Sequence, residues 1–597
     1  MRRFVAIFLL ALSVIAFSAP ASAKTDPARC RTVRMADVGW TDVTATTGLL
    51  ARILHGLGYQ PRISVLSVPV TLNGLSRGDV DIFLGNWMPM QQSDIAPYIK
   101  DGSIARVRAN LTDARYTLAV PAYLYKQGLT DFSKIADFGD ALDHKIYGIE
   151  PGNDGNRLVL GMIKKDQFGL GGFNLVESSE QGMLAQVERK VRQKKAIVFL
   201  GWQPHPMNDR FDMRYLSGGD DVFGPNFGGA KVYTVTRRGF SQQCPNVGRL
   251  LDNLAFDVED ENALMQGVTK TGNAQAVAQR WLEAHPDKLE AWLKGVTTFD
   301  GKPAGPAMLK GFGAPKAGNF ITQHKIPVGN WIADAVEWTK SHSALLDIVS
   351  SGVSTSVKTL TRGLSAVPPL LFIAIATVLT WLLRRSIPIT VFVPLALLFI
   401  LNQGYWGATI QTLALVVFAA AISTAIGVPI GIWAGHRPRA YEGLRSVLDL
   451  MQTLPTFVYL IPTLVVFGLG VVPGLISTII FALPAPIRLT QLGIMGVPKP
   501  LLEAGKSFGA TKWQLLLRVE LPAASGSILA GITQCIMLSL SMVVIAALVG
   551  AGGLGVPVVR ALNTVQVGMG FEAGLAIVLL AIILDRVTRH ETKGGQQ

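Results

Sequence analysis

The second half of this chain is divided into apolar segments that are long enough to cross a membrane. Of its 597 residues, 49% are hydrophobic, and the mean hydropathy of +0.35 is high for a fully soluble chain. Because a spanning helix needs about 20 apolar residues, this half is restricted to a bundle of membrane helices. We count seven segments, at residues 367–383, 387–402, 408–434, 453–472, 474–495, 525–550 and 570–585. The first two are short, so the number of spans within 367–402 stays open.

Basic residues between these segments predict how the helices are oriented. The formal net charge is +14, and the positive-inside rule places the loops that are rich in Lys and Arg in the cytoplasm. Those are the loop at 436–445, the loop around Lys499 to Arg518, and the C-terminal segment 586–593. The loops assigned to the outside contain only Arg560. The Lys and Arg residues lie in the loops between the apolar segments and do not form a basic stripe with aromatic residues between the charges. This distribution argues against nucleic-acid binding.

The N-terminus has the three parts of a secretory signal. Arg2 and Arg3 precede the apolar run 4–17, and small residues at 21–23 follow it. This pattern predicts a signal peptide over 1–23, with the domain that follows lying outside the cytoplasm. Retention of the signal as an uncleaved anchor remains the alternative.

Three cysteines are too few for a disulfide framework or a thiol metal site. Cys30 and Cys244 both fall in the exported half, where disulfides persist, so we predict a bond between them. Cys535 lies inside an apolar run and is expected to be an inert core residue. We predict no metal site and no cofactor.

Residues 24–312 alternate short β-rich runs with helical stretches. The runs lie at 32–35, 62–66, 81–84, 117–120, 196–200 and 232–235. This alternation predicts α/β units with parallel sheets. A stretch rich in Gly, Pro and Lys follows and predicts a flexible linker over 313–325. Residues 326–366 then carry apolar side chains at near-helical spacing, which predicts an amphipathic juxtamembrane segment. The membrane domain is expected over 367–590.

Aromatic residues follow several of the expected strands in the exported half. Tryptophans occur in GWTD, GNWMP and FLGWQPHP, a tyrosine in RYTLAVPAY and an asparagine in EPGNDGNR; these residues are Trp40, Trp87, Trp202, Tyr116 and Asn153. A quaternary ammonium ion donates no hydrogen bond and is held by aromatic faces, each contributing about 0.5–2 kcal/mol. The group therefore predicts a cage for such a cation.

Asp42 favours choline as the ligand of this cage. An ionised carboxylate accepts a hydroxyl hydrogen but repels the carboxylate of a betaine. His205 could serve a betaine carboxylate if protonated, although its position between two prolines is typical of a turn residue. Glycine betaine therefore stays open as the second ligand.

A family resemblance supports this interpretation. It is carried by VRMADVGWTDVTATT, GDVDIFLGNWMP, YTLAVPAY, GNDG, FLGWQPHPMN and FGPNFGGAKVYT. These stretches resemble the periplasmic choline-binding proteins of the glycine betaine/choline substrate-binding family. The resemblance implies a two-lobed α/β periplasmic binding domain, similar to type II, whose lobes close on the ligand. It also implies an aromatic box of Trp40, Trp87, Tyr116 and Trp202, with Asp42 and Asn153 at the hydroxyl end.

The stretch EAGKSFGATKWQLLLRVELPAA, residues 503–524, resembles the EAA loop of ABC importer permeases. Glycine at 505 replaces the usual second alanine. In that family the loop forms a short helix that couples the permease to an ATPase subunit. The matching residues are Glu503, Ala504, Gly509, Leu521 and Pro522. We expect Gly509 to permit a turn and Leu521-Pro522 to end the helix before the next span.

No phosphate-binding loop accompanies this coupling loop. Gly505-Lys506-Ser507 lacks the required glycine five residues earlier, where Pro500 stands. The chain is therefore expected to need a separate ATPase and to be no enzyme itself. Because it has one such loop, a homodimer is expected.

Together these features predict a binding protein fused to the permease of an ATP-driven choline importer. It would lie in the inner membrane as a multi-pass protein, with the binding domain on the periplasmic side. The alternatives are an osmoprotectant importer for glycine betaine or proline betaine, and a membrane-tethered choline sensor.

Overall fold

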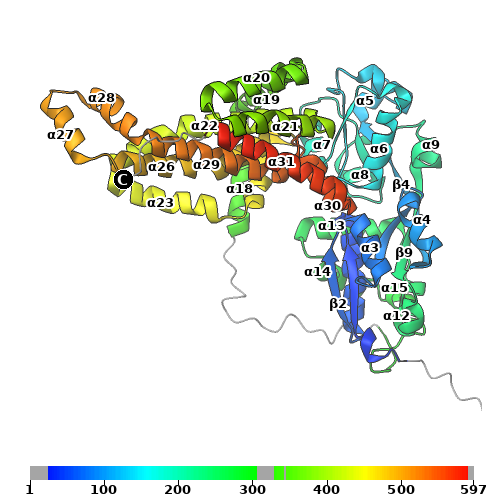
Figure 1. Ribbon diagram of the computed structural model, residues 1–597. Coiled ribbons are helices and arrows are strands. Elements are labelled where there is room, and N and C mark those ends of the chain that lie inside the picture. Colours follow the sequence, from blue (N-terminus) through cyan, green and yellow to red (C-terminus); the bar gives the residue numbers. More distant parts are fainter. Residues whose placement is uncertain (1–24, 306–327, 342–343, 589–597) are drawn as a thin grey trace, which may run out of the picture. The chain divides into compact units, whose positions relative to one another are not determined.

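The computed structural model describes residues 25–305, 328–341 and 344–588 (Figure 1). The predicted signal peptide and linker lie outside these residues. The chain forms two compact units. Unit 1 contains Met1–Thr117 and Gly201–Lys325, and unit 2 contains Leu118–Leu200 and Ile326–Gln597. The chain passes between them within strand β4 (Ile104–Pro121) and again within strand β7 (Phe199–Gln203).

Unit 1 is an α/β domain built on a mixed sheet, in the strand order β2-β1-β3-β9-β4. Its other strands include β1 (Thr32–Asp37), β2 (Gln60–Val65), β3 (Ile82–Met88) and β9 (Gly229–Arg237), and the short strand β8 (Met213–Tyr215) pairs with β4. Strand β1 pairs in parallel with β2 and β3, as the alternation predicts. Strand β9 is antiparallel to both β3 and β4. The predicted parallel pairing is thus confirmed for β1, β2 and β3, whereas the antiparallel β9 makes the sheet mixed, because strand direction depends on pairing between distant segments.

Asp81 joins three strands of this sheet through charged hydrogen bonds. It accepts from the guanidinium of Arg34 at 2.7 and 3.0 Å and from Nε of Arg237 at 2.6 Å. Arg34 lies on β1 and Arg237 ends β9. Burial by itself raises the pKa of Asp81, but the hydrogen bonds from Arg34 and Arg237 outweigh it and hold the pKa below its ordinary value.

We expect Asp81→Asn to destabilise the sheet by about 2 kcal/mol at pH 7, because it removes the charge that both guanidinium groups need. A carboxylate with a depressed pKa contributes stability above its unfolded pKa and loses it as pH falls. The difference between variant and wild type should therefore shrink below about pH 4. Hydrogen exchange of the β1 and β3 amides at pH 7 and pH 3 measures this difference in stability. A difference of the same size at both pH values would show that the Asp81 charge is not its cause.

Cys30 and Cys244 are joined by a disulfide, with Cα atoms 5.8 Å apart. Both residues are buried, at 2% exposure each. The bond closes a loop with a sequence separation of 214 residues. It therefore connects the start of unit 1 to the segment that follows β9.

The first part of unit 2, residues 118–200, is a smaller α/β lobe. Strand β5 (Lys145–Tyr147) pairs in parallel with β6 (Asn174–Val176) and β7. Helix α6 (Asp154–Lys164) follows β5, and helix α7 (Glu180–Arg192) follows β6. The loops after β5 and β6 both lead into helix N-termini, which is where such sheets commonly carry ligands.

The rest of unit 2 is helical. Its helices are α18 (Val328–Ser341), α19 (Ala344–Ala366), α20 (Pro369–Arg384), α21 (Ile387–Asn402), α22 (Trp406–Gly435), α23 (Pro438–Thr453), α24 (Thr456–Phe467), α25 (Val471–Ala482), α26 (Pro484–Met495), α27 (Lys499–Ser507), α28 (Lys512–Leu515), α29 (Leu521–Ala547), α30 (Gly555–Thr564) and α31 (Val567–Thr588). Figure 1 shows α22, α26, α29 and α31 side by side, in agreement with their contacts.

Four helical segments in the described part of the chain are long and apolar enough to cross a membrane: Trp406–Gly435, Val471–Met495, Lys512–Ala547 and Val567–Thr588. The number rises to six if each of two bent pairs forms one span. These pairs are Ile348–Ala366 with Pro369–Arg384, bent by 97°, and Pro438–Thr453 with Thr456–Phe467, bent by 88°. Ile387–Asn402 is apolar but shorter. Two of the seven predicted spans are thus halves of bent pairs, and the predicted loop 436–445 is largely helical.

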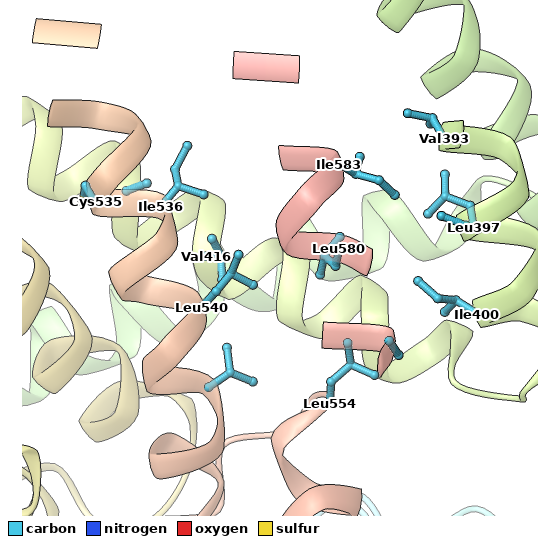
Figure 2. Close-up of a cluster of buried hydrophobic side chains, with 14 of the residues drawn as sticks. Val393, Leu397, Ile400, Val416, Cys535, Ile536, Leu540, Leu554, Leu580 and Ile583 are labelled. Atoms are coloured by element: carbon cyan, nitrogen blue, oxygen red, sulfur yellow. The ribbon is translucent and has the colours of Figure 1, made fainter. Parts of the chain in front are cut away.

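Helices α21, α22, α29 and α31 share one apolar core (Figure 2). Val393, Leu397 and Ile400 lie on α21 and are at most 3% exposed. Cys535, on α29, belongs to this cluster and is fully buried, as expected from the sequence. Apolar side chains thus pack these helices against one another.

Candidate ligand-binding site and coupling loop

A tight turn after β1 presents Trp40 and Asp42. Gly39 adopts a positive φ of 78°, and the Asp37 carboxylate accepts its backbone N–H at 2.8 Å. Asp37 also accepts the Thr44 hydroxyl at 2.8 Å, which ties the turn to helix α2 (Thr41–Gly56). Trp40 and Asp42 are consequently buried at the start of α2, with 6% and 4% exposure.

Trp87 lies at the end of β3 and contacts Asp42 directly. Its Nε1 donates to Oδ2 of Asp42 at 3.0 Å, with both groups buried. The carboxylate therefore fixes the orientation of the indole ring, a role that the sequence interpretation did not assign to it. A negative charge held beside an aromatic face favours a cationic ligand.

Trp87, Tyr116 and Trp202 form a continuous series of ring contacts. The ring centroids of Trp87 and Tyr116 are 6.0 Å apart, and those of Tyr116 and Trp202 are also 6.0 Å apart. Both contacts are edge-to-face and all three rings are buried. Phe223 adds a further contact to Tyr116 at 6.1 Å. Phe223 begins the stretch FGPNFGGAKVYT, which carries the family resemblance, but we assigned it no place in the cage from the sequence.

His205 packs edge-to-face against Trp202. The two ring centroids are 4.9 Å apart, and His205 is 3% exposed. Its Nδ1 accepts the backbone N–H of Met207 at 3.0 Å, which leaves Nε2 as the ring donor. This geometry is that of a turn residue, which was the preferred interpretation of the sequence.

Glu261 is a second carboxyl group close to Asp42. It lies on helix α13 (Val258–Thr271), which packs against α2, and it is 3% exposed. Burial, followed by the nearby charge of Asp42, raises the pKa of Glu261 well above its ordinary value. A single glutamate in a helical stretch does not reveal from the sequence that it is buried near another carboxyl group, so the sequence interpretation missed Glu261.

Asn153 lies in unit 2 and caps helix α6. Its Oδ1 accepts the backbone N–H groups of Gly155 and Asn156 at 2.8 and 3.2 Å. Its Nδ2 donates to Asp154 Oδ1 at 3.1 Å. The structure therefore shows that Asn153 caps helix α6. Contact with a ligand would be a second function of the same side chain. The ring series and Asp42, by contrast, all lie in unit 1.

The coupling loop comprises α27, a turn, α28 and a π-helical segment (Leu516–Glu520). Glu503 and Ala504 lie exposed on α27, and Gly509 has a positive φ of 74°, as the predicted turn requires. The expected helix end at Leu521-Pro522 was wrong. Pro522 lies in the first turn of α29, and the π segment joins α28 to α29 without a break. Pro is tolerated there because the wider π ladder does not require its missing N–H.

Two aromatic residues of the coupling loop are exposed. Phe508 is 91% exposed and Trp513 is 72% exposed. Exposed apolar side chains of this size can serve contacts with a partner protein. The resemblance pointed to the acidic and glycine positions, and the exposure of these two aromatic side chains became evident only from the structure.

Each of the two predicted parts of the chain matches a known protein family. Residues 31–284 match the family described as the substrate binding domain of the ABC-type glycine betaine transport system. Residues 427–591 match the family described as the binding-protein-dependent transport system inner membrane component. The glycine betaine transport system permease protein OpuAB of Bacillus subtilis (strain 168) is 45% identical over 45% of this chain and 94% of its own length.

The chain belongs to the binding-protein-dependent ABC transport permeases. It joins a permease of the glycine betaine type to a substrate-binding domain of the same transport class, and both families are transporter components rather than enzymes. The predicted fold class and the family are thus confirmed.

Two further proteins are similar to parts of the chain. The glycine betaine/proline betaine permease protein ProW of Escherichia coli (strain K12) is 42% identical over 44% of this chain and 75% of its own length. A solved ABC-transporter choline binding protein in complex with choline is 54% identical, covering 48% of this chain and 99% of its own, with a TM-score of 0.47.

Proposed function

We propose that the chain is the combined binding protein and permease of an ATP-driven choline importer. The observation that carries the proposal is the series of buried rings Trp87, Tyr116 and Trp202, with the Asp42 carboxylate bonded to the first of them. Aromatic faces and a buried anion together stabilise a cation that cannot donate hydrogen bonds. Trp40, two residues before Asp42 in the chain, completes the proposed cage. We also propose that Asn153, the capping residue of helix α6, contacts the hydroxyl end of the ligand.

The choice between choline and glycine betaine depends on the carboxyl groups of unit 1. Asp42 is 4% exposed and its carboxylate accepts the Nε1–H of Trp87 at 3.0 Å. A betaine carboxylate beside it would add a second negative charge, and an unpaired buried charge costs several kcal/mol. Glycine betaine is the second candidate, because relatives of the permease part are named for it.

Asp42→Asn provides the test of ligand choice. We expect it to raise the Kd for choline about tenfold, because it removes a charge near the cation while keeping an amide oxygen as acceptor. The Kd for glycine betaine should stay the same or fall. Isothermal titration of the purified full chain with each ligand measures both values. If the wild type binds glycine betaine more tightly than choline, the protein is instead an importer of the osmoprotectant glycine betaine.

The proposal includes a separate ATPase subunit that contacts the coupling loop. Phe508 and Trp513 supply an apolar surface for it, and Glu503 lies exposed on the same loop. With one such loop per chain, two copies would be needed to contact two ATPase subunits. Native mass spectrometry of the assembled complex should therefore show two copies, and a single copy would contradict the homodimer.

The proposed location is the inner membrane, with the binding domain on the periplasmic side after removal of residues 1–23. Helix α18 would lie at the membrane surface, since Trp331, Ile332 and Trp338 are each more than half exposed. A membrane-tethered sensor would share the binding domain, but it would not need an exposed coupling loop. Choline uptake that depends on ATP in reconstituted vesicles distinguishes an importer from such a sensor.

A further inference from the structure

Arg560 was the only basic residue in the loops that the sequence assigned to the outside, and the structure gives it a partner within unit 2. It lies on α30, and its Nη2 donates to Oε2 of Glu177 at 2.5 Å. The Glu177 side chain is 6% exposed and that of Arg560 is 33% exposed. A buried carboxylate paired with a guanidinium is a strong contact whose loss leaves an uncompensated charge.

Glu177 also supports the loop that carries Asn153. Its second oxygen, Oε1, accepts Nδ2 of Asn156 at 3.2 Å. Asn156 accepts the backbone N–H of Ile149 at 3.0 Å and donates to the carbonyl of Ile149 at 2.9 Å. The amide thus closes residues 149–156 into a fixed loop. One carboxylate therefore contacts the permease helix α30 and the loop of the proposed ligand residue.

Helix α30 touches the same loop at a second place. Nδ2 of Asn563 donates to the carbonyl of Pro151 at 2.9 Å. The next residue, Gly152, has a positive φ of 90°, and a Cβ there would come within 2.8 Å of Cγ2 of Thr564. Close packing of α30 against the loop therefore excludes a side chain at position 152. Movement of the loop would change both contacts with α30.

A third contact lies elsewhere on the same lobe. The backbone N–H of Leu469, in the turn between α24 and α25, donates to Oε1 of Gln186 on α7 at 3.0 Å. Gln186 is 6% exposed. Helix α30 and the turn between α24 and α25 therefore both contact this lobe, and the contacts at α30 include the loop of Asn153.

We propose that Glu177, Arg560 and Asn563 couple the ligand loop 149–156 to the permease through helix α30. The inference deepens the proposed function, on which it rests. Arg560 and Asn563 are positioning residues, because they act on the ligand loop through Glu177 and the Pro151 carbonyl. A ligand that displaces Asn153 would shift Asn156 and hence the carboxylate held by Arg560, which transmits occupancy to α30.

The contact itself is tested without transport. The double variant Pro151→Cys, Asn563→Cys in the membrane-embedded full chain is oxidised, and the linker 313–325 is then cut by protease. We expect the two fragments to stay joined until a reductant is added, whereas the matched pair Asp137→Cys, Asn563→Cys should separate. The native disulfide does not interfere, because Cys30 and Cys244 both lie in the first fragment. Separation of the first pair, with and without choline, would overturn the proposal.

The coupling role is tested by Arg560→Gln in the reconstituted complex. We expect choline uptake to fall about tenfold, because a buried charge pair is broken, while the Kd for choline measured by titration stays within about twofold. Glu177→Gln combined with Arg560→Gln should lose no more than Arg560→Gln alone, since both act on one contact. Uptake unchanged by Arg560→Gln, or losses that simply add, would overturn it. Absence of choline binding by the wild type would instead refute the proposed function.

Discussion

Replacement of Trp87 by alanine is expected to raise the Kd for choline on the order of a hundredfold, equivalent to about 3 kcal/mol. The change removes one aromatic face, worth up to about 2 kcal/mol to a desolvated cation. It also removes the Nε1–H that holds the Asp42 carboxylate at 3.0 Å. Asp42 would then lose its fixed orientation beside the cation. Titration of the purified full chain with choline measures the effect.

Trp87→Phe separates these two contributions. Phenylalanine keeps an aromatic face but lacks the indole donor, so we expect a smaller rise in Kd, about tenfold. Trp338→Ala is the control, since Trp338 is 65% exposed on α18 and is no part of the ring series. If Trp87→Ala binds choline as tightly as the control does, the aromatic cage is not the ligand site.

Replacement of Phe508 by aspartate is expected to weaken binding of the ATPase subunit about thirtyfold, equivalent to about 2 kcal/mol, and to abolish uptake. Phe508 is 91% exposed at the end of α27, which is the position of an apolar anchor in a protein interface. A charge at that place would be buried without a partner when the ATPase docks. Co-purification of the ATPase with the variant, at graded concentrations, measures the affinity.

Phe571→Ala is the matched control for this experiment. Phe571 is also exposed, at 71%, but it lies in the first turns of α31 outside the coupling loop. We expect it to leave ATPase binding unchanged. Choline binding should be normal in both variants, because neither change touches unit 1. Wild-type ATPase affinity in Phe508→Asp would place the docking surface elsewhere.

The fold class could be predicted because strong local patterns specify it. Strand and helix alternation in 24–312 identified most strands of unit 1, including β1, β2 and β3, within a few residues. The direction of β9 could not be predicted, since antiparallel pairing with β3 and β4 depends on a segment more than 100 residues away. Local preference indicates that a strand forms but does not determine which neighbour it pairs with.

The candidate site was predictable in part for a similar reason. Trp87 and Trp202 follow expected strands and were identified from their positions. Phe223 begins a stretch that carries the resemblance, but neither Phe223 nor Glu261 was assigned to the site, because their positions near Tyr116 and Asp42 depend on packing between distant segments. Likewise, Pro522 was taken for a helix end. A π-helical segment lets the chain continue through it, and only the backbone geometry reveals that segment.

The sequence by itself determined that the chain joins an exported α/β domain to a bundle of apolar helices, because composition and hydrophobic period act over short stretches. It also placed Arg560 alone among the outside loops. Only the tertiary structure decided that Asp42 holds the Trp87 ring and that Glu177 is the partner of Arg560. These contacts join residues 45 and 383 positions apart. Partners at such separations are brought together by packing of the whole fold, which local sequence preferences do not encode.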